Sequence, residues 1–208
     1  MFNKLIVLSI IILINTGCAG VQISKDTLSK IKTINIDSNI STPDDIFVQG
    51  KIDPISSILY GGIGAGMSSI MASTSASEQV QKFMEINNIK INEIVLNEYK
   101  KELLKTGRFK LSSPGDATLK IVINTYGFGN SDALSDNNKR KPLLNVKASL
   151  IQNNRIIWEK QEYVTNFSDL TTPYDMNDLA QKPDLLKKSF SQAANIVASQ
   201  AFSQLLAN

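Results

Sequence analysis

One cysteine and no histidine limit the chemistry open to this chain of 208 residues. Without histidine the chain cannot form a Ser-His-Asp or Cys-His catalytic arrangement, or a zinc site that uses histidine. Cys18 alone cannot form an internal disulfide or a multi-cysteine metal site. We therefore predict a protein without catalytic residues, cofactor or metal, in which modification of Cys18 is the main covalent chemistry.

Carboxylates are the remaining candidates for acid and base chemistry. They lie in two stretches that we predict to be loops. Aspartates in loops usually stabilise turns or contact solvent. A carboxylate-based cell-wall enzyme is therefore only a further hypothesis, which alanine substitutions at these positions would test. The aspartates are Asp132 and Asp136 in one stretch and Asp169, Asp175 and Asp178 in the other.

The first 17 residues have the pattern of a signal peptide. Lys4 gives a positive start, and residues 5–14 are strongly apolar except for Ser9. A helix that crosses the hydrocarbon core of a membrane needs about 20 apolar residues, so this run is too short for a permanent span. We predict that residues 1–17 are a signal peptide and are removed.

The residues around Cys18 resemble the end of a bacterial lipobox. Thr16 and Gly17 are small residues directly before the cysteine, although Asn15 stands where these motifs usually carry an apolar residue. The resemblance implies a lipoprotein whose Cys18 carries acyl chains such as palmitate and becomes the new N-terminus, a strong membrane anchor. The alternative is that Cys18 is a small apolar residue of a signal peptide that is cleaved elsewhere.

Composition and charge agree with a folded envelope protein. Apolar residues make up 42% of the chain and charged residues 20%, which is typical of a globular domain. The chain from Cys18 onward has 21 basic and 19 acidic residues, so nothing in its net charge predicts a nucleic-acid partner. Ala19 follows the cysteine, and the sorting preference of lipoproteins implies the outer membrane. This preference does not determine the leaflet, and we expect the periplasmic face.

The sequence after Cys18 divides into a tether and one domain. Residues 18–30 are polar with little periodicity, and we predict a lipidated tether there. Residues 31–208 then form a single domain, because this length suits one hydrophobic core.

An uncharged segment at 55–77 is the most unusual part of the predicted domain. Residues 54–77 contain no charged side chain and are rich in serine and glycine. One interpretation is a flexible insertion or a buried turn. The other is close packing against a second helix or a membrane, which small residues permit. The glycines concerned are Gly61, Gly62, Gly64 and Gly66.

The remaining pattern predicts strands and two long helices. Apolar spacing of three and four residues predicts a helix over 78–106, which Asn87 and Asn88 interrupt, and a final helix that begins at Pro183. Alternation predicts strands, with a hairpin turn at Asn153 and Asn154. The strand ranges are 31–37, 46–48, 109–111, 118–126, 144–150 and 156–164, with long loops at 127–142 and 166–182.

These elements predict an α+β fold. We expect a mainly antiparallel sheet of four or five strands with two helices packed on one face, because this arrangement buries every apolar face economically.

Two stretches near the middle of the chain resemble envelope lipoproteins. Residues 101–111 place Gly107, Arg108 and Phe109 at the end of a predicted helix, and residues 116–123 lead into a long strand. The pattern is similar to curli-secretion lipoproteins, penicillin-binding-protein activator lipoproteins and the N-terminal domain of TolB. The resemblance implies an envelope lipoprotein and transfers no catalytic or binding residue.

The function that follows is a non-enzymatic binding or assembly module. We expect it to be anchored through Cys18 and to contact an envelope protein through its two long loops. The alternative is a subunit of an oligomeric export or exclusion complex in the outer membrane, in which copies of the chain pack through segment 55–77. Deleting this segment would leave the first kind of protein active and would disrupt the second.

Overall fold

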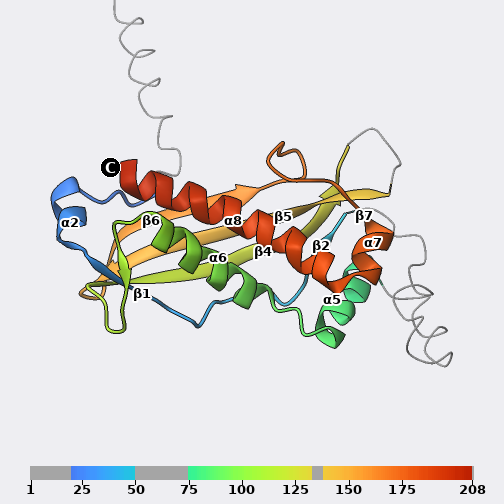
Figure 1. Cartoon of the computed structure of the whole chain (residues 1–208), viewed down its shortest axis with the longest axis horizontal. Coiled ribbons are helices and arrows are strands. Elements are labelled where there is room, and N and C mark those ends of the chain that lie inside the picture. Colours follow the sequence, from blue (N-terminus) through green and yellow to red (C-terminus); the bar gives the residue numbers. More distant parts are fainter. Residues whose placement is uncertain (1–19, 50–74, 133–137, 208) are drawn as a thin grey trace, which may run out of the picture.

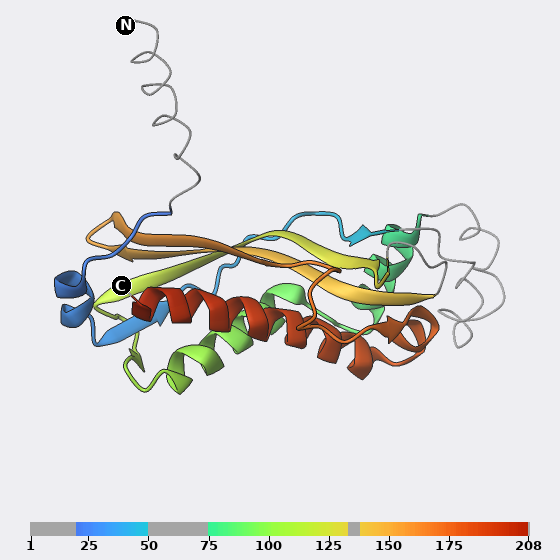
Figure 2. The ribbon, with the colours of Figure 1, turned by 90° about the horizontal axis from the view of Figure 1, so that it is seen from above.

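The computed structural model describes residues 20–49, 75–132 and 138–207. The predicted signal peptide, Cys18 and the four glycines at 61–66 lie outside these residues. The described strands form one sheet, and the two longest helices lie together on one of its faces (Figures 1 and 2). The strands are β1 (Thr33–Ile36), β2 (Phe47–Val48), β3 (Lys110–Leu111), β4 (Ala117–Asn130), β5 (Lys139–Gln152), β6 (Arg155–Val164) and β7 (Tyr174–Asp175). The helices are α2 (Lys25–Lys30), α5 (Ala76–Ile86), α6 (Ile91–Lys105), α7 (Met176–Gln181) and α8 (Pro183–Ala207).

Three long antiparallel strands, β4, β5 and β6, make up the centre of the sheet. The β5–β6 turn lies at Asn153 and Asn154, whose φ angles are 50° and 59°. Two successive residues with positive φ match the right-handed twist of a hairpin, and asparagine tolerates this conformation. The predicted hairpin is therefore confirmed.

The sheet as a whole is mixed, so the prediction of a mainly antiparallel sheet with four or five strands is wrong. The main path of this seven-stranded sheet runs β3-β1-β4-β5-β6, with β2 paired to β4 and β7 to β5. Strand β1 pairs in parallel with both β3 and β4, and β2 also runs parallel to β4. The chain passes through α5 and α6 between β1 and β4, and such a crossover returns it in the same direction.

The described residues contain five helices rather than the predicted two. The chain breaks between α5 and α6, where Asn88 has a φ of 50°, as the asparagine pair predicts. Ser75 and Glu78 form a capping box that fixes the start of α5. The additional helices α2 and α7 are single short segments of six residues each, too short to give a clear periodic signal.

The core lies between the sheet and the helix pair α6 and α8. Strand β5 directs every second side chain toward the helices, and α8 opposes them with small and aromatic residues. The two helices also contact each other, because the rings of Tyr99 and Phe202 meet edge to face with centroids 5.8 Å apart. The buried residues of β5 and α8 include Leu144, Val146, Ala148, Leu150, Phe190, Ala193, Val197 and Ala201.

The stretch predicted as a loop at 127–142 belongs largely to two strands. Strand β4 continues to Asn130 and β5 begins at Lys139, so only the short connection between them is outside the sheet. Gly127 permits this continuation: a Cβ atom there would lie 1.7 Å from the carbonyl oxygen of Phe47. The glycine therefore marks the close approach of β2, and not a turn.

The second predicted loop, at 166–182, is also partly regular. It contains β7 and α7, and Asp175 caps α7 by accepting a hydrogen bond from the backbone N–H of Asn177 at 2.8 Å. The irregular segment that remains follows β6 directly.

Residues 20–30, which we expected to be part of a tether, pack onto the domain. Ile23 and Leu28 are buried, and Nη2 of Arg108 donates to the carbonyl oxygen of Leu28 at 3.1 Å. The folded domain therefore includes Gly20, two residues after the predicted lipidation site. Among the residues that the structure describes, no helix is both long and apolar enough to cross a bilayer.

Candidate functional site: a groove beside strand β6

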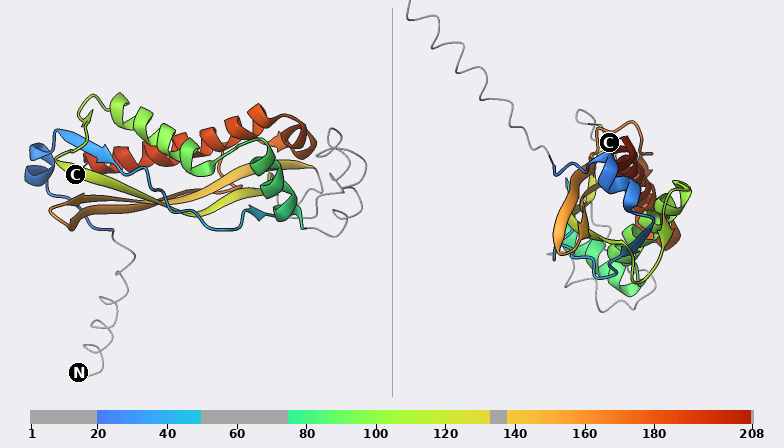
Figure 3. Two further views of the ribbon diagram at one scale, coloured as in Figure 1. Left: turned by 90° about the horizontal axis from the view of Figure 1, so that it is seen from below. Right: turned by 90° about the vertical axis from the view of Figure 1, so that its left-hand side faces the viewer.

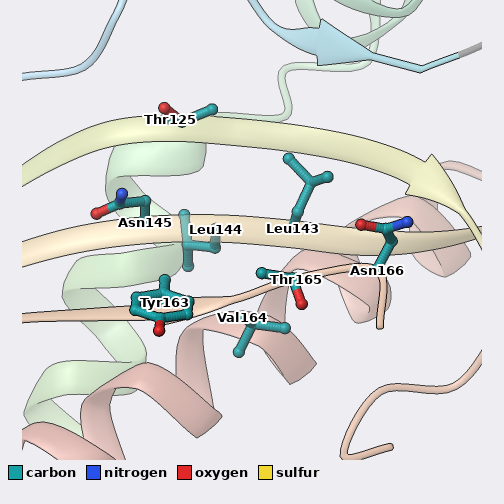
Figure 4. A pocket seen from close by; sticks show the side chains of 8 residues that line it. All are labelled: Thr125, Leu143, Leu144, Asn145, Tyr163, Val164, Thr165 and Asn166. Atoms are coloured by element: carbon teal, nitrogen blue, oxygen red, sulfur yellow. The ribbon is translucent and has the colours of Figure 1, made fainter. Parts of the chain in front are cut away.

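A groove of about 240 Å³ lies on the sheet face opposite the helices, where β6 ends (Figure 4). We call it the β6 groove. Its lining carries no charged side chain, so it suits a neutral or apolar group. The lining residues are Thr125, Leu143, Asn145, Tyr163, Thr165 and Asn166, together with Leu144 and Val164, which are buried and belong to the helix-facing rows of β5 and β6.

The register of the sheet places three side chains of this groove in one row. Thr125 pairs with Asn145, and Asn145 pairs with Tyr163. A register shift between Ile123 and Thr125 puts an extra residue, Asn124, into β4 at this point. Such irregularities redirect side chains locally, which brings Thr125 onto the open face.

Asn145 forms the polar centre of the row. Its Oδ1 accepts hydrogen bonds from Nδ2 of Asn124 at 3.2 Å and from Nε2 of Gln161 at 2.9 Å. Neighbours on the two adjacent strands, β4 and β6, therefore fix this side chain, and its orientation does not depend on a ligand.

The segment after β6 begins at the groove residue Asn166 and is tied both to the sheet and to α8. Nδ2 of Asn166 donates to the carbonyl oxygen of Asn130 at 2.9 Å, and Nζ of Lys141 donates to that of Ser168 at 2.9 Å. On the other side, Nε2 of Gln192 in α8 donates to the carbonyl oxygen of Leu170 at 3.3 Å. We call residues 166–172 the tied loop.

Three large apolar side chains are exposed along β6 and the tied loop. The exposed fraction is 64% for Tyr163, 68% for Phe167 and 60% for Leu170. Large apolar side chains that stay exposed can mark a binding site, and aromatic residues contribute most to such contacts. The hydrogen bonds of the tied loop hold the backbone at Phe167 and Leu170 in place. Binding a partner therefore costs little additional conformational entropy of this loop.

The outer edge of β6 offers free backbone groups next to the groove. The N–H of Glu159 donates to the carbonyl oxygen of Val21 at 2.9 Å and therefore points away from β5. In an antiparallel strand the backbone groups of every second residue point the same way, so those of Gln161 and Tyr163 also face outward. No described segment pairs with them.

A second polar group lies on the helix side of the sheet. The hydroxyl of Tyr99 and Oε1 of Glu162 are buried without a hydrogen-bond partner among the described residues. Burial raises the pKa of the Tyr99 hydroxyl, and the nearby Glu162 adds to the shift. Burial also raises the pKa of Glu162, although Lys160 partly opposes this. Glu162 pairs with Val146 on the covered face, so this group is separate from the β6 groove.

The sequence did not nominate any of the described residues that line the groove. Cys18, Gly61, Gly62, Gly64 and Gly66 lie outside the described residues, so their roles stay predictions.

Two of the three aspartates of the second predicted loop have separate structural roles. Asp175 caps a helix, and Asp178 pairs with Lys182 at 2.8 Å. The described residues contain no group of three or more side chains that could hold a metal ion.

The main residues of this surface could not be recognised from the sequence. Trp158 and Tyr163 lie on the same predicted strand, and of these two only Trp158 is buried. The available signal was Phe167 and Leu170, two large apolar residues in an otherwise polar loop. Their exposure could not be deduced, because a loop residue can equally fold back onto the core.

Comparisons with known proteins identify no family. No protein-family model matches the sequence, and no curated protein matches it. Similar solved structures include a Xanthomonas campestris protein of the DUF330 family, with 12% identity, a TM-score of 0.47 and coverage of 83% of this chain and 81% of that one. Lipoprotein GNA1162 from Neisseria meningitidis has 13% identity, a TM-score of 0.28 and coverage of 85% and 99%. A candidate lipoprotein from Caulobacter crescentus has 14% identity, a TM-score of 0.34 and coverage of 56% and 79%. Likenesses this distant carry no argument about function.

Proposed function

We propose that this protein is a non-enzymatic lipoprotein of the outer membrane that binds a partner protein at the β6 groove. One observation supports this function most strongly: the tied loop, which continues from the groove residue Asn166, holds Phe167 and Leu170 exposed. Exposed apolar groups that are held in place are costly in water unless a partner covers them.

The partner contributes an extended segment that lies along β6. The outward backbone groups of Gln161 and Tyr163 pair with its backbone, as Glu159 already pairs with Val21. Backbone pairing of this kind gives affinity, and side chains at alternate positions give specificity. An apolar side chain of the segment then enters the uncharged β6 groove against Leu143 and Tyr163.

Site-specific photocrosslinking in cells tests this function. A photoreactive phenylalanine analogue at Tyr163 or Phe167 should give a discrete crosslinked product with one envelope protein. The control position is Leu104, which is exposed on α6, on the opposite side of the sheet. Equal products at Leu104 and Phe167, or none at Tyr163 and Phe167, would contradict the proposed site.

Substitution of the exposed apolar pair gives a quantitative test. The double variant Phe167→Ser with Leu170→Ser should weaken binding to the crosslinked partner by at least about tenfold, since such residues dominate interface energies. Its folding stability should stay near that of the wild type, because both side chains are exposed. Leu104→Ser is the matched control and should leave binding unchanged.

The lipid anchor needs its own measurement. Intact mass spectrometry of the protein extracted from membranes should give a chain that begins at Cys18 and carries acyl chains. Cys18→Ala should release the protein from the membrane fraction, because it removes the acyl chains that we propose as the anchor. A mass that corresponds to another N-terminus would refute the anchor and leave the β6 groove untouched.

A further inference from the structure

The chain is docked on β6 almost immediately after the predicted lipidation site. A Cβ atom on Gly20 would lie 2.1 Å from the carbonyl oxygen of Glu159, so only glycine allows this contact. The next residue, Val21, accepts the hydrogen bond from the N–H of Glu159.

This docking leaves very little free chain between lipid and domain. Only Ala19 separates Cys18 from Gly20, and two residues of extended chain span at most about 7 Å. An acylated Cys18 therefore holds β6 near Glu159 close to the headgroups of the bilayer.

Several segments gather near this attachment, toward one end of the molecule (Figures 1 and 3). We call them the anchor end. The contacts between them include pairing of Thr33 with Lys110 and a hydrogen bond from Nε2 of Gln152 to the carbonyl oxygen of Asp116 at 3.2 Å. The anchor end consists of residues 20–33, 106–117, 152–156 and 203–207.

The anchor end carries the excess positive charge of the protein. It holds six basic side chains against the two carboxylates Asp26 and Asp116. The net charge of the mature chain is +2, so the rest of it has a net charge of −2. Asp26 pairs with Lys30 at 2.6 Å, and Asp116 accepts from backbone N–H groups at 2.8 Å. The basic residues are Lys25, Lys30, Lys32, Arg108, Lys110 and Arg155.

Exposed apolar side chains accompany these charges. The exposed fractions are 44% for Val21, 48% for Ile156 and 38% for Leu206. Basic residues that surround apolar ones are the combination that binds an anionic membrane surface.

We propose that the anchor end lies against the bilayer, with its basic side chains on anionic headgroups. The short connection to Cys18 brings this end to the membrane, and the charge asymmetry fixes its orientation. The β6 groove lies toward the other end of β6 and stays open to a partner in the periplasm. This orientation rests on the proposed acylation of Cys18.

Single introduced cysteines test the orientation on the acylated full-length protein. Cys18 is the only cysteine and is blocked by its thioether once acylated, so an introduced thiol is the only reactive one. Ser29→Cys, exposed on α2, reports the anchor end, and Gln181→Cys, exposed at the end of α7, is the matched control. Each is labelled with an environment-sensitive fluorophore in vesicles of phosphatidylethanolamine and phosphatidylglycerol.

The expected result is a label at position 29 that is several-fold better protected from an aqueous quencher than the label at position 181. The protection should decrease in Lys25→Glu with Arg155→Glu and at high salt, because screening weakens contacts with headgroups. Equal protection at both positions would overturn the orientation, as would protection that appears only in native envelopes, which would indicate a protein partner.

The mass of the same samples shows whether the orientation alone is wrong or whether the acyl anchor is wrong as well. An acylated protein with equal protection at both positions contradicts the orientation alone. A protein without acyl chains contradicts the proposed anchor, and the orientation fails with it.

Discussion

The two faces of the β4–β5–β6 sheet use the same strands for different purposes. On the helix side, β5 presents Leu144 and Val146 to α8, and both are buried. On the open side, the same strand presents Leu143 and Asn145 to the β6 groove. Because side chains alternate along a strand, adjacent residues of one strand serve stability and binding separately.

The covered face is largely apolar, but not at Tyr99 and Glu162. Tyr99 and Glu162 place polar atoms among apolar groups, without partners among the described residues. On the open face, by contrast, Asn145 is fully engaged by its neighbours through Oδ1. Burying the Tyr99 hydroxyl and the Glu162 carboxyl among apolar groups therefore costs folding free energy at this point of the covered face.

The sharpest test of the comparison uses two adjacent leucines on opposite faces. Leu144→Ala should destabilise the protein by about 2–5 kcal/mol, because the side chain is buried under α8. Leu143→Ala should cost about 1 kcal/mol or less and should instead weaken partner binding. Urea denaturation of both variants measures the difference, and equal costs would show that the two faces are not functionally distinct.

Removing the Tyr99 hydroxyl should have a smaller effect on folding stability, and of opposite sign. Tyr99→Phe should leave stability unchanged or increase it by about 1 kcal/mol, because it removes a buried hydroxyl that finds no partner in the described part of the chain. Thermal and urea unfolding measure this, with Tyr163→Phe on the open face as the control. A loss of stability in Tyr99→Phe would indicate that the hydroxyl is hydrogen-bonded.

Glu162 predicts a pH dependence. Burial raises its pKa above the ordinary 4.5, so its contribution to stability is present at low pH and is lost as pH rises through the folded-state pKa. Glu162→Gln removes this loss, so the variant should gain stability relative to the wild type as pH rises above 4.5. Urea midpoints measured from pH 4 to pH 8 test the trend, and a difference that is constant with pH would contradict it.

The smallest effect on folding stability is expected at Asn145, in the centre of the open face. Asn145→Ala should cost about 0.5 kcal/mol or less, since its hydrogen bonds lie on a solvent-accessible surface. Partner binding should nevertheless fall measurably, because the side chain orders the β6 groove. Isothermal titration against the crosslinked partner checks this, and a large loss of stability would instead place Asn145 in the core.

Much of the secondary structure could be predicted from local patterns. The hairpin at Asn153, the break at Asn88 and the helix from Pro183 all follow from residue types within a few positions. The pairing of β1 with β3 and β4 could not, because parallel partners are distant in sequence and leave no local signal. The expected loop around Gly127 failed for the same reason, since that glycine serves a strand from elsewhere in the chain.

The candidate site was less accessible to prediction than the fold. The composition of the lining residues is ordinary, and the groove exists only because a register shift in β4 and the tied loop meet at the end of β6. Gly20 likewise has no local distinction, and its role follows only from the carbonyl oxygen of Glu159.

The sequence by itself determined the alternation of β5, the turns and the apolar stripe of α8, because these depend on near neighbours. It also provided the predicted anchor at Cys18 and the absence of histidine chemistry. Only the tertiary structure decided that the sheet is mixed, that Phe167 is exposed and that positive charge gathers where the chain enters the domain. Each of these depends on which distant segments come into contact, and such contacts are decided by the packing of the whole core.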